Sequence, residues 1–419
     1  MSRWWVRLLR ITWCASTACL ANEDSLAGKL GISGALRTDY FSSSRSLDER
    51  SDLLGTTVQM KALPRLSDWV DGKLEVRVTN SGLNKGDSVT TTWTEAYLNA
   101  FLSDIDLRLG KQIVAWGRAD AINPTDNLTP RDYTVLLPFD EDQRSGVMGA
   151  KFDYYPDTDR TATVFLSFDF KPSKLPLTPP PGRVFVFDEP GSRWVRGVGA
   201  KYSETGVDAD WSLSFFHGYS LFPEAYAINA GGGVIRLRYP TVDVIGGDYA
   251  QNFGRYGFRA EAAYFIPHQS DGFQEALLKP YLYFVVGADR TFYENLNVNV
   301  QTFVRFVRDY VDPGVVTDPN LRVLAQQNAL TFVQQDRWSP GMTVRISDRW
   351  FNDTLQAELF QHFYIKRANA YLQLMLTYAF SDHLKGTIGA QYYQGGDDTV
   401  FGALDRNRNV FAELRYSFP

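Results

Sequence analysis

The sequence predicts an all-β protein, a transmembrane antiparallel up-and-down β-barrel of about 18 strands, with 16 as the alternative. Three observations carry this prediction. Apolar and polar residues alternate at every second position along most of the chain. The links between these runs are short and long in turn. Beyond the N-terminus, no stretch approaches the roughly 18 consecutive apolar residues of a membrane helix.

Runs of alternating residues supply the predicted strands. Near the C-terminus, Leu372, Leu374 and Leu376 form one row, and Gln373 and Met375 stand between them. Because successive side chains of a strand point to opposite faces, each run has one apolar and one polar face. We expect strands at residues 29–41, 53–63, 72–81, 91–102, 105–116, 146–155, 160–170, 194–204, 208–218, 241–252, 255–266, 278–290, 294–307, 338–348, 353–365, 371–380, 384–392 and 408–418.

The links between the predicted strands sort by length. Links after even-numbered strands are short, whereas links after odd-numbered strands are mostly long. Tight turns at one end and long loops at the other are typical of outer-membrane barrels, in which the short turns are periplasmic. A soluble sandwich has no reason to sort its links in this way. The long links are 116–145, 170–194, 218–241 and 307–338, and the link near Ala368 is a short exception.

A lipid environment requires the sheet to close. Arg or Lys at the bilayer midplane costs roughly 2–4 kcal/mol, so the apolar rows are expected to face lipid. Backbone groups in hydrocarbon must pair within the protein, and we therefore expect strand 29–41 to pair with strand 408–418. Lys111 stands on the apolar row of 105–116, which a register break or a position near the interface would accommodate.

The N-terminus has the pattern of a secretory signal peptide. Three arginines among the first ten residues precede a moderately apolar segment at 11–20, and Ala18 and Ala21 are small residues suited to cleavage. The sequence therefore predicts a signal peptide at 1–21 and a mature barrel at 22–419.

Composition excludes several function classes. A net charge of −5 without a basic run argues against a nucleic-acid partner. Both cysteines, Cys14 and Cys19, lie within the predicted leader, so the mature chain offers no thiol ligand. Along the chain the histidines show no metal-ligand spacing. We expect no metal site, no cofactor and no enzymatic activity. The histidines are His217, His268, His362 and His383.

One long loop carries a distinctive motif. Residues 110–126 read Gly-Lys-Gln-Ile-Val-Ala-Trp-Gly-Arg-Ala-Asp-Ala-Ile-Asn-Pro-Thr-Asp. The pattern Gly-Lys-Gln…Trp-Gly…Asn-Pro-x-Asp resembles the signature of porin-like proteobacterial outer-membrane barrels of unassigned function. Residues 246–265 form a second segment that resembles the same family. The resemblance extends over the mature chain. It implies a channel in the outer membrane of a Gram-negative bacterium and, by analogy with porins, a homotrimer.

By strand count, residues 116–145 form the third loop at the outer end of the predicted barrel. In general porins that loop folds into the barrel and narrows the pore, and the resemblance implies the same here; the alternative is a loop resting on the rim. Gly117 permits a sharp bend, and Pro124 and Pro130 stiffen the segment. Charged side chains there would set the field across a constriction. The constriction candidates are Arg118, Asp120, Asn123, Asp126, Arg131 and Asp132.

The polar rows of the predicted strands carry charges of both signs. This mixture suits a hydrated channel with weak ion preference, and the alternative is a scaffold of internal salt bridges. The candidate lumen-lining residues are Arg37, Glu75, Arg77, Glu95, Arg108, Arg259, Glu261, Arg305, Arg345, Glu358, Lys385, Glu413 and Arg415.

The expected function is diffusion of small solutes through an outer-membrane channel, with membrane lipid and a small-molecule solute as partners. Two alternatives remain open at this point. One is a selective uptake channel for hydrophobic or aromatic compounds. The other is a barrel scaffold that sheathes a periplasmic protein partner, such as an electron-transfer or export complex.

Overall fold

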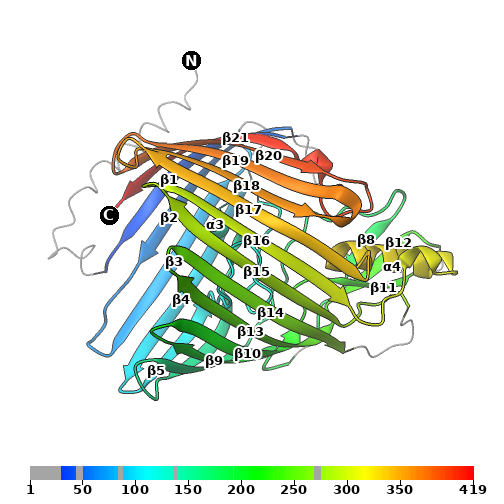
Figure 1. Cartoon of the computed structure of the whole chain (residues 1–419), viewed down its shortest axis with the longest axis horizontal. Coiled ribbons are helices and arrows are strands. Elements are labelled where there is room, and N and C mark those ends of the chain that lie inside the picture. The colour runs from blue at the N-terminus through cyan, green and yellow to red at the C-terminus, as the bar shows by residue number, and fades with distance from the viewer. Residues whose placement is uncertain are drawn as a thin grey trace.

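Eighteen antiparallel strands close into one barrel in the computed structural model of the chain (Figure 1). Consecutive wall strands pair with each other, and β1 (Ser33–Ser43) pairs with β21 (Asn409–Phe418) to close the sheet. The predicted fold class, strand count and closure are confirmed. The structure describes residues 30–43, 51–83, 88–135, 139–191, 193–229, 231–268 and 275–419.

The other wall strands lie within a few residues of their predicted positions. They are β2 (Asp52–Ala62), β3 (Val70–Asn80), β4 (Val89–Leu102), β5 (Ile105–Gln112), β6 (Val147–Tyr154), β7 (Arg160–Ser167), β9 (Gly197–Thr205), β10 (Ala209–Tyr219), β13 (Thr241–Phe253), β14 (Tyr256–His268), β15 (Tyr281–Phe292), β16 (Leu296–Val307), β17 (Trp338–Trp350), β18 (Leu355–Tyr364), β19 (Asn369–Ala379) and β20 (Leu384–Gln394).

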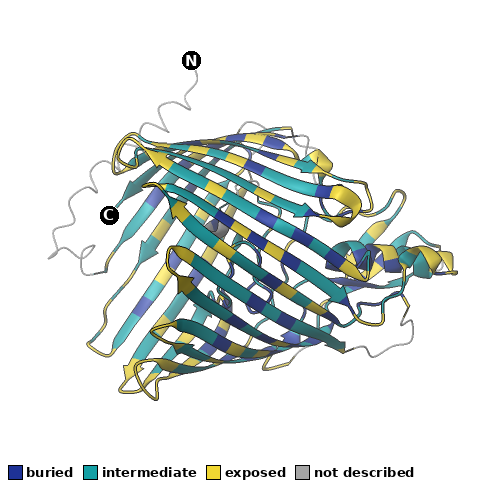
Figure 2. Ribbon diagram, viewed as in Figure 1, coloured by how far each residue is buried: buried dark blue, intermediate teal, exposed yellow. Residues whose placement is uncertain are grey.

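The two rows of each strand face different surroundings (Figure 2). On β19, Leu374 points outward with 45% of its surface exposed, whereas its neighbour Gln373 points inward and is 6% exposed. On β16, Val300 and Asn299 show the same contrast. The outer wall is therefore apolar and the inner wall polar, as a strand between lipid and a lumen requires.

Strand β5 ends four residues before its predicted end. The backbone N–H of Ile113 donates to the Glu95 carboxylate at 3.0 Å, so at this residue the chain leaves the wall of the barrel. Lys111 stays on the outward row close to this end of β5, and its ammonium donates to the carbonyl oxygen of Trp93. The position near the strand end accommodates the charge that the alternation placed on the apolar row.

The short turns that follow even-numbered wall strands, counted along the chain, lie at one end of the barrel, and the long loops lie at the other (Figure 1). We call these the short-turn end and the long-loop end. The four-residue link between β18 and β19, at the long-loop end, is the predicted short exception. Three long links that were predicted to be loops contain further structure. They hold a small sheet of β8 (Val184–Phe187), β11 (Glu224–Ile228) and β12 (Val234–Arg238), and the helix α4 (Pro319–Phe332). The other short helices within the described residues are α3 (Asp140–Gln143), η1 (Pro313–Val315), η2 (Lys366–Ala368) and η3 (Asp405–Asn407).

The helix and the small sheet share a hydrophobic core. Ile235 and Leu237 of β12 and Ala225 of β11 pack with Leu324 and Ala325 of α4. We call this unit, formed by β8, β11, β12 and α4, the cap. It lies at the long-loop end of the barrel (Figure 1). Within the described residues, α4 is too short and too polar to cross a membrane, and the same holds for every other helix there.

Candidate functional site

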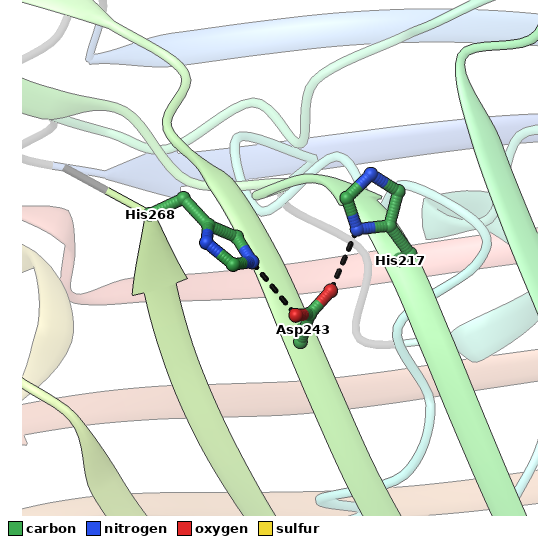
Figure 3. A group of neighbouring side chains, drawn as sticks. All are labelled: His217, Asp243 and His268. Atoms are coloured by element: carbon green, nitrogen blue, oxygen red, sulfur yellow. Dashed lines mark hydrogen bonds and ion pairs between the residues drawn. The ribbon is translucent and has the colours of Figure 1, made fainter. Parts of the chain in front are cut away.

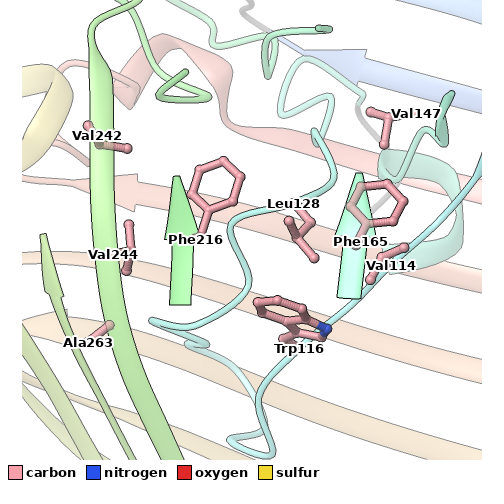
Figure 4. Packing of buried hydrophobic residues seen from close by; sticks show 9 residues of the cluster. All are labelled: Val114, Trp116, Leu128, Val147, Phe165, Phe216, Val242, Val244 and Ala263. Atoms are coloured by element: carbon pink, nitrogen blue, oxygen red, sulfur yellow. The ribbon is translucent and has the colours of Figure 1, made fainter. Parts of the chain in front are cut away.

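The link between β5 and β6 comprises residues 113–146, and its described parts, 113–135 and 139–146, fold into the interior of the barrel. We call this segment the inner loop. Trp116 and Leu128 of the inner loop pack against Phe165 on β7, Phe216 on β10 and Val244 on β13 (Figure 4). Because these wall residues belong to the inward rows, the loop lies against the inner wall rather than on the rim.

One buried carboxylate, Glu261 on β14, holds the bend of the inner loop. It is 1% exposed and accepts hydrogen bonds from the backbone N–H groups of Arg118 (3.1 Å), Ala119 (3.2 Å) and Thr125 (2.7 Å). The hydroxyl of Thr125 donates to it as well, at 2.8 Å. Gly117 has φ +90°, and a Cβ atom there would stand 2.5 Å from a Glu261 oxygen. The bend therefore requires glycine at this position.

Two further contacts extend the inner loop across the wall. The Arg118 guanidinium donates to Asp248 on β13 at 2.6 Å and to Asp210 on β10 at 3.0 Å. On the other side of the bend, Asp120 pairs with Arg345 on β17 at 3.2 Å. The first arm of the loop thus spans the inner wall from β10 to β17.

The returning arm of the inner loop is fixed by Asp126 and Asp142. Asp126 accepts from Arg144 at 2.8 Å and from Arg131 at 3.3 Å. Asp142, which is buried, accepts from Arg37 on β1 at 2.9 Å and lies 3.1 Å from the guanidinium of Arg77 on β3. Ion pairs therefore anchor the loop on both sides of the barrel, which restricts its motion.

A cavity of about 1090 Å³ lies between the inner loop and the wall. Part of its lining is aromatic and includes Tyr283, Tyr364, Tyr371, Tyr393 and Phe401. These rings come from β15, β18, β19, β20 and the link between β20 and β21. We call this part of the lining the aromatic side of the cavity. Tyr364, Tyr371 and Tyr393 lie on three consecutive wall strands. β15 is separated from β18 by two strands, and the ring of Phe303 on β16 lies between Tyr283 (6.2 Å) and Tyr364 (5.2 Å).

Charged groups stand beside this aromatic side. The Arg305 guanidinium lies over the rings of Tyr283, at 4.4 Å, and Tyr281, at 4.9 Å, and both tyrosines also line the cavity. Arg345 lines it too, beside the ring of Phe360 at 5.4 Å. Cations held over aromatic faces are stabilised by the ring quadrupole. The cavity thus combines apolar faces with fixed positive charge.

The structure divides the constriction candidates into two groups. Asp120, Asn123, Asp126 and Arg131 line the cavity. Arg118 is turned to the carboxylates of the wall. Asp132 pairs with Lys174 at 2.9 Å, in the link between β7 and β9.

The candidate lumen-lining residues occupy inward rows, but most are paired. Arg37 lies 3.4 Å from Glu413, and Arg259 pairs with Asp289 at 2.5 Å. Lys73 bridges Glu75 and Glu95. Arg108 donates to Asn99 and covers the ring of Tyr97. Lys385 and Arg415 are cross-strand neighbours at the short-turn end. Among the lumen-lining candidates, Arg305, Arg345 and Glu358 line the cavity.

Sequence reasoning missed two groups. It did not find the aromatic side of the cavity. Aromatic residues alternate with polar residues on both kinds of row, so the pattern does not show which aromatic residues face the lumen. It also found no grouping of histidines, because it compared their spacing along the chain only. In the fold, His217, Asp243 and His268 meet on adjacent strands (Figure 3). The signal for this group is cross-strand register, which the sequence alone does not display.

No protein-family model matches the sequence, and no curated protein matches it. Among solved structures, the chain is similar to OccAB3 of Acinetobacter baumannii, with a TM-score of 0.56 and 9% identity over 92% of this chain and 98% of that one. OccK5 (OpdH) of Pseudomonas aeruginosa gives a TM-score of 0.54 and 9% identity over 92% and 96% of the two chains. OccD3 (OpdP) of the same organism gives 0.53 and 10% over 93% and 91%. These similarities concern the fold alone, which in this chain is a closed, 18-stranded antiparallel β-barrel.

Proposed function

We propose that the protein is a channel through which small solutes diffuse across the outer membrane of a Gram-negative bacterium. The observation that carries the proposal is a closed barrel with an apolar outer row, a polar inner row and a cavity of about 1090 Å³ beside an inner loop. Such a wall suits lipid outside and water inside. In known outer-membrane barrels the short turns are periplasmic and the long loops are extracellular, so the long-loop end would be extracellular here.

The inner loop would narrow the path of the solute. It is held by Glu261 on one side and by the contacts of Asp142 with Arg37 and Arg77 on the other, so it would stay in the lumen during passage. Charged groups at a constriction set ion preference. Asp120 and Arg345, which line the cavity as a pair, are the groups expected to do so here.

Planar-bilayer recordings test the channel and its constriction. The purified protein should give stable single-channel steps, and a variant in which a short Gly-Ser linker replaces residues 118–140 should give larger ones. A matched control replaces Gly231–Gly233, in the β11–β12 turn of the cap, by three serines and should leave the conductance unchanged. A wild-type protein that gives no single-channel steps would overturn the proposed channel function. A loop variant with the same step size as the wild type would overturn the proposed constriction.

A second candidate function is selective uptake of aromatic compounds, and the aromatic side of the cavity favours it. Stacking on Tyr371, Tyr393 and Phe401 would hold a ring, while Arg305 would attract a negative group. Benzoate added to the bilayer chamber should then block the current, and a Tyr371→Ala, Tyr393→Ala double variant should lose the block. A block that survives both substitutions would reject this candidate.

We further propose that the protein belongs to the porin-like family that residues 110–126 suggest, that it forms a homotrimer and that it has no enzymatic activity. The predicted signal peptide at 1–21 lies outside the described residues. The alternative of a periplasmic protein partner predicts a second protein in the purified complex. Native mass spectrometry of the detergent-extracted protein measures both the subunit number and such a partner.

A further inference from the structure

Three side chains on the outside of the barrel form a compact group of metal-ligand type (Figure 3). His217 lies near the end of β10, Asp243 near the start of β13, and His268 is the last residue of β14. His217 is the cross-strand partner of Asp243, and His268 is the partner of Thr241, two residues earlier on β13. Antiparallel register therefore brings one ligand from each of three consecutive wall strands to the same level.

The group is both close-packed and accessible. Nδ1 of His217 lies 2.6 Å from one carboxylate oxygen of Asp243, and Nε2 of His268 lies 2.7 Å from the other. One ligand atom from each residue lies within 4.8 Å of the other two. The side chains of His217 and His268 are 45% and 51% exposed and lie at the long-loop end of their strands, so no other part of the described protein covers them.

We propose that His217, Asp243 and His268 form a site for a zinc-type transition-metal ion on the outer wall of the barrel, at the long-loop end. Two imidazole nitrogens with one carboxylate are a donor set that suits Zn²⁺, Cu²⁺ or Ni²⁺, whereas Mg²⁺ and Ca²⁺ prefer oxygen ligands. Three protein ligands leave a fourth tetrahedral position for water.

The rearrangement needed for binding is small. With metal–ligand bonds of about 2.0–2.1 Å, tetrahedral donors stand about 3.3 Å apart. One donor atom from each of the three residues already lies within 4.8 Å of the other two, so no pair would have to approach by more than about 1.5 Å. Exposed side chains at strand ends can rotate by that amount. The ion would replace the two hydrogen bonds by coordination and would join β10, β13 and β14 where the cap and the adjacent long loop leave the wall.

A hydrolytic triad is the competing interpretation of this group, and it lacks a nucleophile on β10. A serine would have to stand beside His217 on the outward row. Ser212 and Ser214 of the same strand lie on the opposite row, and Ser212 donates its hydroxyl hydrogen to Asp248 on the inner wall. The donor set therefore favours coordination of an ion.

Calorimetric titration of tag-free, detergent-purified protein with ZnCl₂ tests the site. The wild type should bind one Zn²⁺ per chain, and His217→Gln, His268→Gln and Asp243→Asn should each weaken binding at least tenfold. His383→Gln, in the turn between β19 and β20 at the opposite end, should bind as the wild type does. Heat-modifiable migration on a gel confirms that each variant is a folded barrel.

Two further measurements do not depend on the variants. Co²⁺ should give visible absorption bands of a low-coordinate ion in the wild type, and Zn²⁺ should displace it. CaCl₂ should bind far more weakly than ZnCl₂. The proposal is overturned if the wild type binds no Zn²⁺, if all three variants keep its affinity, or if Ca²⁺ binds as tightly as Zn²⁺.

Discussion

At the scale of single residues, the position of the inner loop depends on one glycine and one carboxylate. Glu261 accepts hydrogen bonds from two successive N–H groups, those of Arg118 and Ala119, which only a sharp bend at Gly117 can aim at the same oxygen. Each buried N–H donor left without this carboxylate would cost about 1–3 kcal/mol. The pair therefore determines whether the loop stays in the lumen.

Gly117→Ala should loosen the inner loop. The positive φ costs an alanine about 1–2 kcal/mol, and the added Cβ atom also displaces the Glu261 carboxylate. Gly182→Ala is the matched control, because Gly182 also has positive φ, at +75°, but no atom within 4 Å of the added Cβ. Limited proteolysis of the folded protein should cut the inner loop faster in Gly117→Ala only. Equal cleavage rates in the two variants would show that the carboxylate does not hold the bend.

At the scale of elements, the strands of the wall could be predicted and the cap could not. A wall strand such as β16 alternates over twelve residues, so its period is unmistakable. The strands of the cap have four or five residues, too few for a period to show. Helix α4 begins with Asp318, which caps two backbone N–H groups, followed by Pro319, and this start signal was readable. Its apolar positions do not form a clear stripe, and the helix was therefore missed.

The candidate site was predictable to a similar extent. The resemblance to porins implied an inner loop, with a loop on the rim as the alternative, and Gly117 was recognised as permitting the bend. The partners of that loop on the wall, Asp210 and Asp248, were not found, because they lie more than ninety residues away in the sequence and only the barrel register brings them close.

The rows of β19 should respond differently to charge. Leu374→Arg places a cation toward lipid and should lower the stability of the barrel by about 2–4 kcal/mol if the residue lies near the midplane. Gln373→Arg, one position away, points into the cavity and should cost far less. Urea titration in lipid vesicles, followed by tryptophan fluorescence, measures both. Similar losses in the two variants would mean that the assignment of inner and outer rows is wrong.

The cap depends on one amide of α4. The side chain of Asn328 accepts from the N–H of Ala225 at 2.6 Å and donates to the carbonyl oxygens of Ala225 and Ala276, both at 2.8 Å. Asn328→Ala leaves these buried groups without partners, at about 1–3 kcal/mol each. Hydrogen exchange of β11 should accelerate in this variant and stay unchanged in Asn320→Ala, on the exposed side of the same helix. Unchanged exchange in Asn328→Ala would contradict the role of the amide.

At the scale of the whole molecule, the inner loop can make its contacts with the wall only if the sheet closes. The inner loop contacts β1, β3, β10, β13, β14 and β17, which are brought to one lumen only when β21 pairs with β1. An open sheet would leave two rows of backbone N–H and C=O groups in hydrocarbon, and each unpaired group there costs several kcal/mol. The barrel should therefore assemble completely or not at all.

Removal of residues 409–419 tests this condition, because it deletes β21 and leaves the edges of β1 and β20 unpaired. The truncated chain should show no heat-modifiable band and should be degraded or extracted by urea from membranes. Removal of Pro419 alone leaves β21 intact and should assemble normally, since that residue lies beyond the last ladder pair, Gly34 with Phe418. A truncated chain that still formed a folded, membrane-embedded barrel would show that β1 and β20 can close the wall without the last strand.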